Sequence, residues 1–174
     1  MTPTDDTTQA MQRDLARMAA QEATLRLPRF DEAIAWQLGS ALRQAALDRG
    51  VAVTIELRLA RETVFLHAMP GTTPANADWA RRKRNTVELL QRSSYAVGRS
   101  LALEGQTLEA KMGLAPRDFA SAGGSFPLRL GDTLGGACVG TVTVSGLPQR
   151  DDHALVVEVL AQHLGLDPAR LSLE

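Results

Sequence analysis

The sequence is poor in cysteine and in aromatic residues. It has one cysteine, Cys138, in 174 residues, and aromatic residues make up 4% of the chain. A single cysteine permits no disulfide within the chain, and we interpret Cys138 as a buried, inert thiol because no cation or base lies beside it in the sequence. The three histidines are isolated from one another, and no spacing typical of zinc ligands is present, so we expect no metal site.

The sequence also lacks an excess of charge of either sign and a long apolar run. Its formal net charge is −1, so the overall charge does not indicate a nucleic-acid partner. The segment 1–24 is polar and the apolar runs are too short to span a bilayer, so we expect no signal peptide, no membrane segment and a cytoplasmic location. Apolar residues make up 44% and charged residues 22%, which predicts one globular domain with a sizeable core.

Motifs of the common catalytic and nucleotide-binding sites are missing as well. The glycine-rich segments SAGGSF and GDTLGG carry neither a Walker pattern nor G-x-G-x-x-G, which excludes a nucleotide-binding fingerprint. Ser145 has no G-x-S-x-G frame, which excludes the nucleophile elbow of a hydrolase. Because no complete catalytic set is visible, the sequence leaves open whether the protein is an enzyme.

The most readable stretch of the chain runs from Gly123 to Leu164. Its second expected strand carries apolar residues on both faces, which predicts a central strand that is covered on both sides. Acidic residues at the start of the helix that follows suit the positive end of the helix dipole. The expected elements are strands at 125–130 and 137–145, a turn beginning at Gly131-Asp132, a loop at 146–148, and a helix that opens at Asp151-Asp152 and is closed by Gly165.

The first half of the chain predicts a second hairpin between helices. Alternation over 51–59 is the cleanest strand pattern in the sequence, and a short link joins it to a strand at 63–69. We expect the two hairpins to form one antiparallel sheet, whereas 100–119 shows no clear period. Helices are expected at 9–23, with a thin apolar stripe for a partner subunit or the domain edge, at 31–50, with Asp31 and Gly50 as caps, and from about Asp78 to Ser94.

The helix that begins near Asp78 contains the basic run Arg81 to Arg84. Its apolar stripe places Lys83, and with it Arg82, along the buried face. Their stems could lie on the edge of the core with the charges reaching water, or the cations could form a wall that holds a carboxylate or phosphate. A nucleic-acid patch is the weakest interpretation, because no aromatic residues are interleaved with the basic ones. Pairing of Lys83 with Asp152 would make the site structural, and a bound anion would make it functional.

Three segments, PGTTPANADWARRKRN, SAGGSFPLRL and VGTVTVSGLPQRDDH, together resemble the haem-degrading-domain family, in particular its short, uncharacterised bacterial and fungal branch. The resemblance covers Leu25 to Gly165. It implies a profilin-like α/β (α+β) domain, with an antiparallel sheet flanked by helices on both faces and with the first and last hairpin strands adjacent. It also implies assembly into dimers or larger rings. The expected division is an N-terminal extension at 1–24, a domain at 25–166 and a C-terminal tail at 167–174.

His153 follows Asp152 near the start of the last expected helix. The two residues could act as an orienting acid and a base, or the histidine could be a ligand of a metal or of haem. The simpler interpretation is a histidine that fixes the SGLPQ loop by hydrogen bonding. Ser145 is expected to bond the backbone of the same loop.

The function that follows from these observations is an oligomeric binding module for a small anionic organic molecule. Haem or another tetrapyrrole is one candidate, although the low aromatic content is unfavourable for a large flat haem pocket. The alternatives are a protein–protein interaction scaffold without catalysis and an enzyme of unknown reaction. The expected ligand-binding residues are Trp79, Arg82, Lys83, Asn85, Gly123, Gly124, Phe126, Ser145, Gly146, Asp152 and His153, and we expect Trp79, Lys83, Asn85, Gly124, Ser145 and His153 to surround one concavity.

Overall fold

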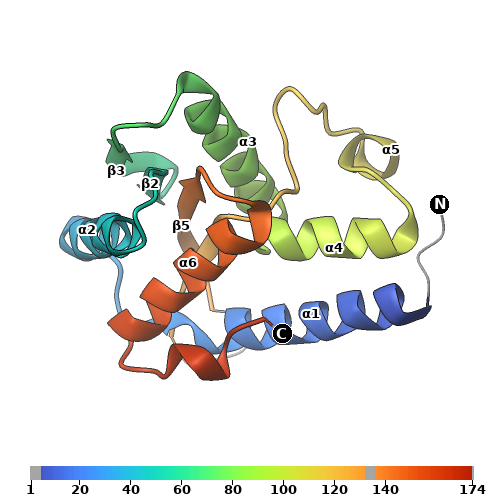
Figure 1. Cartoon of the computed structure of the whole chain (residues 1–174), viewed down its shortest axis with the longest axis horizontal. Coiled ribbons are helices and arrows are strands. Elements are labelled where there is room, and N and C mark those ends of the chain that lie inside the picture. The colour runs from blue at the N-terminus through green and yellow to red at the C-terminus, as the bar shows by residue number, and fades with distance from the viewer. Residues whose placement is uncertain (1–4, 132–135, 174) are drawn as a thin grey trace.

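The computed structural model describes residues 5–131 and 136–173, which form a sheet with helices on both of its faces (Figure 1). The first residues of the expected N-terminal extension (1–4) and the turn expected at Asp132 lie outside the described residues. No helix of the described part is long and apolar enough to cross a bilayer. The elements in chain order are α1 (Asp5–Thr24), β1 (Arg26–Leu27), α2 (Glu32–Asp48), β2 (Thr54–Leu59), β3 (Glu62–Ala68), α3 (Pro74–Leu90), α4 (Ser94–Glu104), α5 (Leu108–Met112), β4 (Ser125–Leu130), β5 (Cys138–Ser145), α6 (Gln149–His163) and the short 3-10 helix η1 (Pro168–Arg170).

The two expected hairpins form one sheet with the strand order β1-β4-β5-β2-β3. β2 pairs with β3, and β4 pairs with β5, both in antiparallel fashion. The hairpins are joined by antiparallel pairing of β2 with β5, in which Thr54 lies opposite Ser145. The expected α+β architecture with these two strands as neighbours is confirmed. The short strand β1 runs parallel to β4 at the sheet edge, so the complete sheet is mixed.

The two faces of the sheet carry different kinds of side chain. Because successive side chains of a strand alternate, Leu57 and Val144 point toward the core formed with α2 and α6. On the opposite face, under α3, the buried side chains are polar. The expectation that β5 is central is confirmed, whereas the expectation that both of its faces are apolar is wrong. The buried polar residues of this second face are Thr54, Glu56, Ser125, Thr141, Thr143 and Ser145.

The hairpin of β2 and β3 is tighter than the alternation alone predicts. β2 begins at Thr54 rather than at Val51, and of the three residues before it Val53 accepts one backbone hydrogen bond, from Met69 at 3.2 Å. Ala60 and Arg61 form the turn, with φ of +49° and +70°. Positive φ at both central positions is what a two-residue type I′ turn requires. The sequence has neither glycine nor asparagine there, so this turn leaves no sequence signal.

α3 begins one turn earlier than expected, at Pro74. The Asn76 side chain accepts a hydrogen bond of 2.8 Å from the backbone N–H of Thr73, and proline suits the first helical position because it has no N–H to satisfy there. The helix ends at Leu90, and Ser93 caps a new helix, α4. The single helix expected in this region is therefore two helices.

α1 packs within the chain, side by side with α4 (Figure 1). Met18 is fully buried against Tyr95 and Ala96, so the apolar stripe of α1 covers the edge of the domain. The sequence left open whether this stripe packs on a partner subunit or on the domain edge. The buried Gln21 donates a hydrogen bond of 2.6 Å to the carbonyl of Leu171 and so holds the C-terminal tail. The division of the chain expected from the sequence stays a prediction.

Candidate functional site

The basic run of α3 sends its cations to separate partners. Successive residues of an α-helix point about 100° apart, so neighbouring side chains face different parts of the fold. Lys83 enters the polar face of the sheet, and Arg84 binds both carboxylate oxygens of Glu56 at 2.8 and 2.9 Å. The other two arginines point toward the segment 115–120. The run therefore connects α3 to other parts of the same chain.

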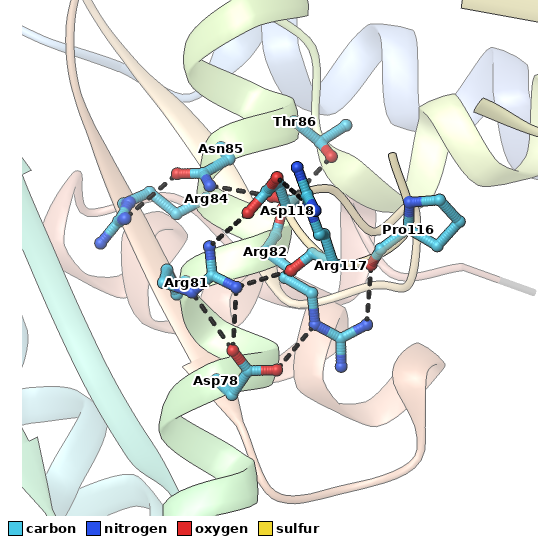
Figure 2. Close-up of polar contacts among 9 residues, drawn as sticks. All are labelled: Asp78, Arg81, Arg82, Arg84, Asn85, Thr86, Pro116, Arg117 and Asp118. Atoms are coloured by element: carbon cyan, nitrogen blue, oxygen red, sulfur yellow. Dashed lines mark hydrogen bonds and ion pairs between the residues drawn. The ribbon is translucent and has the colours of Figure 1, made fainter. Parts of the chain in front are cut away.

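α3 holds the segment 115–120 mainly through main-chain carbonyls, as Figure 2 shows. Arg81 donates to the carbonyl of Arg117 at 2.6 Å, and Asn85 donates to the carbonyl of Asp118 at 2.8 Å. Asn85, expected to bind a ligand, is thus an anchor for this segment and lies away from the expected concavity. The carbonyls that accept such bonds are those of Pro116, Arg117, Asp118 and Ala120.

Arg82 uses two of its five N–H donors within the chain. Its Nε donates to Asp78 at 2.9 Å, and its Nη1 donates to the carbonyl of Pro116 at 3.4 Å. Its guanidinium also lies over the Trp79 ring, 4.0 Å from the ring centroid. Arg82 shares the Asp78 carboxylate with Arg81, so it is paired within the chain and also packs on Trp79.

Lys83 is buried against the end of β5. Its Nζ donates to the carbonyls of Gly123 and Val144 at 2.9 and 2.7 Å, and to the Asp152 carboxylate at 2.9 Å. Burial lowers the pKa of Lys83 and raises the pKa of Asp152, and in each case the charge of the partner opposes the shift. An ammonium has three N–H donors, so Lys83 has none left for a ligand.

Asp152 joins the start of α6 to the loop that precedes it. Beyond its bond from Lys83, its carboxylate accepts from the N–H groups of Leu147 and Gly146 at 3.0 and 3.4 Å. Gly124 packs directly over this pair, because a Cβ there would lie 2.6 Å from the Lys83 Nζ, and its φ is +123°. Of the two alternatives for Lys83, the structure contains the pairing with Asp152. The pair is a structural ion pair.

A cavity of about 270 Å³, which we call the inner cavity, lies beside this ion pair. The first half of α3, the segment 122–123, the end of β5 and the start of α6 form its walls. It brings together more of the expected site than any other place in the described chain. The expected site residues that line it are Trp79, Lys83, Gly123, Ser145, Gly146 and Asp152.

A larger hollow of about 520 Å³, which we call the α4 groove, adjoins the inner cavity. Trp79, Ala122 and Gln149 line both hollows, so the two are neighbours. The groove lies between α3, α4, α5 and the segment 116–122, and Arg82 is a further expected residue on its wall. Its apolar lining residues include Leu101, Leu108, Pro116 and Phe119.

Arg99 lines the α4 groove and was missed by the sequence reasoning. Its guanidinium lies over the ring of Tyr95, 5.0 Å from the centroid, and 3.6 Å from the Asp14 carboxylate. Arg150 bonds the same carboxylate directly, at 2.8 and 3.4 Å. The Nε of Arg99 is buried without a hydrogen-bond partner among the described residues. The i, i+4 spacing of Tyr95 and Arg99 was the available signal.

His153 faces neither hollow, so its expected place in the concavity is wrong. Its Nε2 lies 2.8 Å from the Gln21 side-chain oxygen on α1, and the centroid of its ring lies 5.3 Å from that of Tyr95 and 6.1 Å from that of Phe126. Burial, with a smaller contribution from Arg150, lowers its pKa to about 3, so the ring is neutral. It does not bond the SGLPQ loop either, because it points from α6 toward α1 and α4. Phe126, another expected ligand-binding residue, lines neither hollow and lies in the apolar core.

Comparisons with solved structures agree with this fold. The crystal structure of the Ybr137w protein matches with a TM-score of 0.81 at 22% identity, covering 92% of this chain and 95% of that chain. The crystal structure of a complex named PduOC:Heme matches with a TM-score of 0.62 at 18% identity, covering 78% of this chain and 94% of that chain.

Comparisons with known sequences identify the family. A UPF0303 protein of Edwardsiella ictaluri is 56% identical over 153 residues, which cover 88% of this chain and 96% of the relative. Residues 30–161 match the family model described as haem degrading protein HbpS-like. Most of the chain lies within this match, as the resemblance of its motifs predicted. The chain therefore belongs to the HbpS-like haem-degrading-domain family, within its UPF0303 group.

Proposed function

We propose that this protein is a binding module for an organic anion with an apolar body, and that the α4 groove is the binding site. The observation that carries the proposal is the state of Arg99, a groove residue whose buried Nε has no partner among the described residues. Its nearest carboxylate, Asp14, is bonded directly by Arg150. Arg99 forms no hydrogen bond within the described chain, so the donors of its terminal nitrogens remain for an incoming carboxylate, sulfonate or phosphate, which guanidinium groups bind well.

The size and lining of the α4 groove suit a small organic molecule. Its volume of about 520 Å³ falls within the roughly 300–1,000 Å³ of ligand pockets. Its walls are mainly apolar and include Leu101, Leu108 and Phe119. The apolar body of the ligand packs against these side chains, and its charged group reaches Arg99.

Haem bound through its iron does not fit these two hollows. Haem iron is held by histidine, cysteine, methionine or tyrosine. Among the described residues that line the hollows, Tyr95 alone is of these types, and it is 2% exposed with its hydroxyl bonded to Arg150. The ligand we propose is accordingly an organic anion held without iron coordination.

Titration with the fluorescent anion 8-anilinonaphthalene-1-sulfonate tests this function. We expect saturable binding that Arg99→Gln weakens about tenfold, the effect of losing one charged hydrogen bond. Arg43→Gln, on the exposed side of α2, is the matched control and is expected to leave binding unchanged. Equal binding by the Arg99→Gln variant and the natural protein would overturn the assignment to the groove. Haemin is expected to give no absorbance band of an iron–histidine complex.

A second candidate function is self-association through β3, the edge strand of the sheet. Leu66 on this strand is 65% exposed, and Trp36 on α2 is 68% exposed and leans on Phe65 with a ring distance of 5.6 Å. Sheet edges are normally protected from pairing, and large exposed apolar side chains favour it. Sedimentation at low micromolar concentration tests this: we expect an oligomer that Leu66→Lys dissociates, and the mass of one chain for the natural protein would contradict it.

A further inference from the structure

One hydroxyl group on the wall of the inner cavity has no partner within the described chain. Ser145, the last residue of β5, is 3% exposed and lines the cavity. None of the described residues forms a hydrogen bond with its Oγ. The bond expected from Ser145 to the loop backbone is therefore absent from the described chain. A hydroxyl that lines a cavity bonds to water or to a polar group of a molecule that enters the cavity.

The charges beside Ser145 do not select a charged partner. Lys83 donates all of its N–H groups within the chain, so it has none to offer an anion. The Asp152 carboxylate is already paired with Lys83 and accepts from two backbone N–H groups, so it would repel an anion and has a cation already. The two charges cancel, and the surroundings of Ser145 are polar but neutral overall. A neutral group that donates or accepts hydrogen bonds suits this environment.

The inner cavity lies next to the α4 groove. Trp79, Ala122 and Gln149 line both hollows, so a molecule bound in the groove lies next to the inner cavity. Trp79 on this boundary is 42% exposed, so its side chain is not packed on all sides. Side chains change rotamer far more readily than backbone moves.

We propose that the inner cavity is a subsite for a neutral hydrogen-bonding group, a carboxamide or an alcohol, which bonds to Ser145. A ligand that fills both hollows would be an organic acid. Its acid group would lie in the α4 groove, and an amide or hydroxyl group remote from the acid would lie in the inner cavity. The claim that the ligand is an acid rests on the function proposed for the α4 groove. The claim that the inner cavity binds a neutral group rests on Ser145 and on the ion pair beside it.

Acetamide and acetate are matched probes for this subsite, because they have nearly the same size and differ in charge. Each is titrated into the complete 15N-labelled chain and followed by heteronuclear NMR. We expect acetamide to shift the backbone signals of Ser145 and Gly146 and the indole N–H of Trp79 in a saturable manner. Acetate is expected to leave them in place. The indole N–H of Trp36 is an internal reference, because it lies on α2 across the sheet.

Ser145→Ala isolates the hydroxyl, with Ser40→Ala on the exposed side of α2 as the matched control. We expect Ser145→Ala to weaken acetamide binding about fivefold, as loss of one neutral hydrogen bond does, and Ser40→Ala to leave it unchanged. A dispersed spectrum of each variant shows that it folds. Binding of 8-anilinonaphthalene-1-sulfonate in the groove is expected to be the same in both variants.

The possible outcomes separate the subsite from the proposed function. Equal shifts by acetate and acetamide would overturn the neutral character of the subsite. No saturable shift by either probe, or full acetamide binding by Ser145→Ala, would overturn the subsite and leave water as the partner of Ser145. Acetamide binding without binding of the fluorescent anion would support the subsite and count against the function proposed for the groove.

Discussion

The face of the sheet under α2 and α6 and the face under α3 are both buried, but different interactions hold them. On the first face, Leu57 and Val144 pack in a continuous apolar cluster. On the second face, Glu56 binds Arg84, and Lys83 is bonded at three positions. Apolar contacts are not directional, whereas hydrogen bonds need a defined distance and angle. The polar face therefore sets the position of α3 on the sheet more narrowly than apolar packing would.

The difference also bears on the position of the inner cavity and the α4 groove. Residues of α3 line both the α4 groove and the inner cavity, so both hollows lie on the polar side of the molecule. Apolar side chains on the other face fill their space closely, as protein cores do. On the polar side, the hydroxyls of Thr54 and Thr141 are buried without partners among the described residues. A face built from directional bonds leaves space and unsatisfied groups, and both are features of ligand sites.

The largest expected effect comes from breaking the buried ion pair. Lys83→Met leaves the Asp152 charge buried and unpaired, so we expect the free energy of unfolding to fall by about 3–5 kcal/mol. Leu57→Ala on the apolar face is the reference and is expected to cost about 2–5 kcal/mol. Urea unfolding of both variants measures the two losses. A loss below about 1 kcal/mol for Lys83→Met would mean that the pair does not hold the polar face, contrary to our assignment.

A smaller loss of stability is expected at acid pH, because His153 is buried. Its pKa is about 3 in the folded chain against 6.5 as the ordinary value, so the unfolded chain binds more protons between these pH values. Stability therefore falls as the pH drops below 6.5, by about 2 kcal/mol between pH 7 and pH 5. The groups that face the ring are Tyr95, Phe126, Gln21 and Arg150, and none is a carboxylate that would stabilise its charge.

Unfolding by urea at pH 7 and pH 5 measures this difference. His153→Gln is expected to remove most of the loss between the two values. His163→Gln, at the exposed end of α6, is the matched control and is expected to keep it. If the His153→Gln variant loses as much stability as the natural protein, another group causes the acid sensitivity.

The smallest effects are expected from two threonines on the same face of β5. Thr143 shares a hydrogen bond of 2.7 Å with Ser125, whereas the hydroxyl of Thr141 has no partner among the described residues. Replacing a bonded hydroxyl costs stability and removing an unpartnered one does not. We expect Thr143→Val to lose about 1 kcal/mol and Thr141→Val to gain up to about 1 kcal/mol. Calorimetric melting of both variants checks the signs, and a loss of similar size in both would contradict the contrast.

Local sequence signals predicted the elements well, because each depends on neighbouring residues. Asp31 caps α2 by accepting from the N–H of Ile34 at 2.9 Å, as its position before the helix indicated. Gly50 and Gly165 take positive φ just after helices, as expected for glycine at these ends. The alternation of β2 and β5 located the central strands. Helix caps and strand alternation depend only on residues close together in the sequence, so local patterns were enough to predict them.

The site was harder to predict because its contacts join distant parts of the chain. The stripe of α3 placed Lys83 on the buried side, and Asp152, 69 residues further on, was named as one candidate partner. His153 was grouped with Asp152 because they are adjacent, yet adjacent helical residues point about 100° apart. Arg99 was missed because α4 and α5 are short and interrupted by Gly105, so no long apolar period marked them.

The segment 115–120 is anchored through its main-chain carbonyls, which are present whatever side chains the segment carries. Pro116 and Phe119 from this segment line the α4 groove. Substitutions there can change the shape and chemistry of one wall while α3 keeps that wall in place. During evolution, the residues of the segment 115–120 can thus change while α3 continues to hold its main chain. We expect relatives with different ligands to differ first in this segment, and to keep the donors of α3 that hold it.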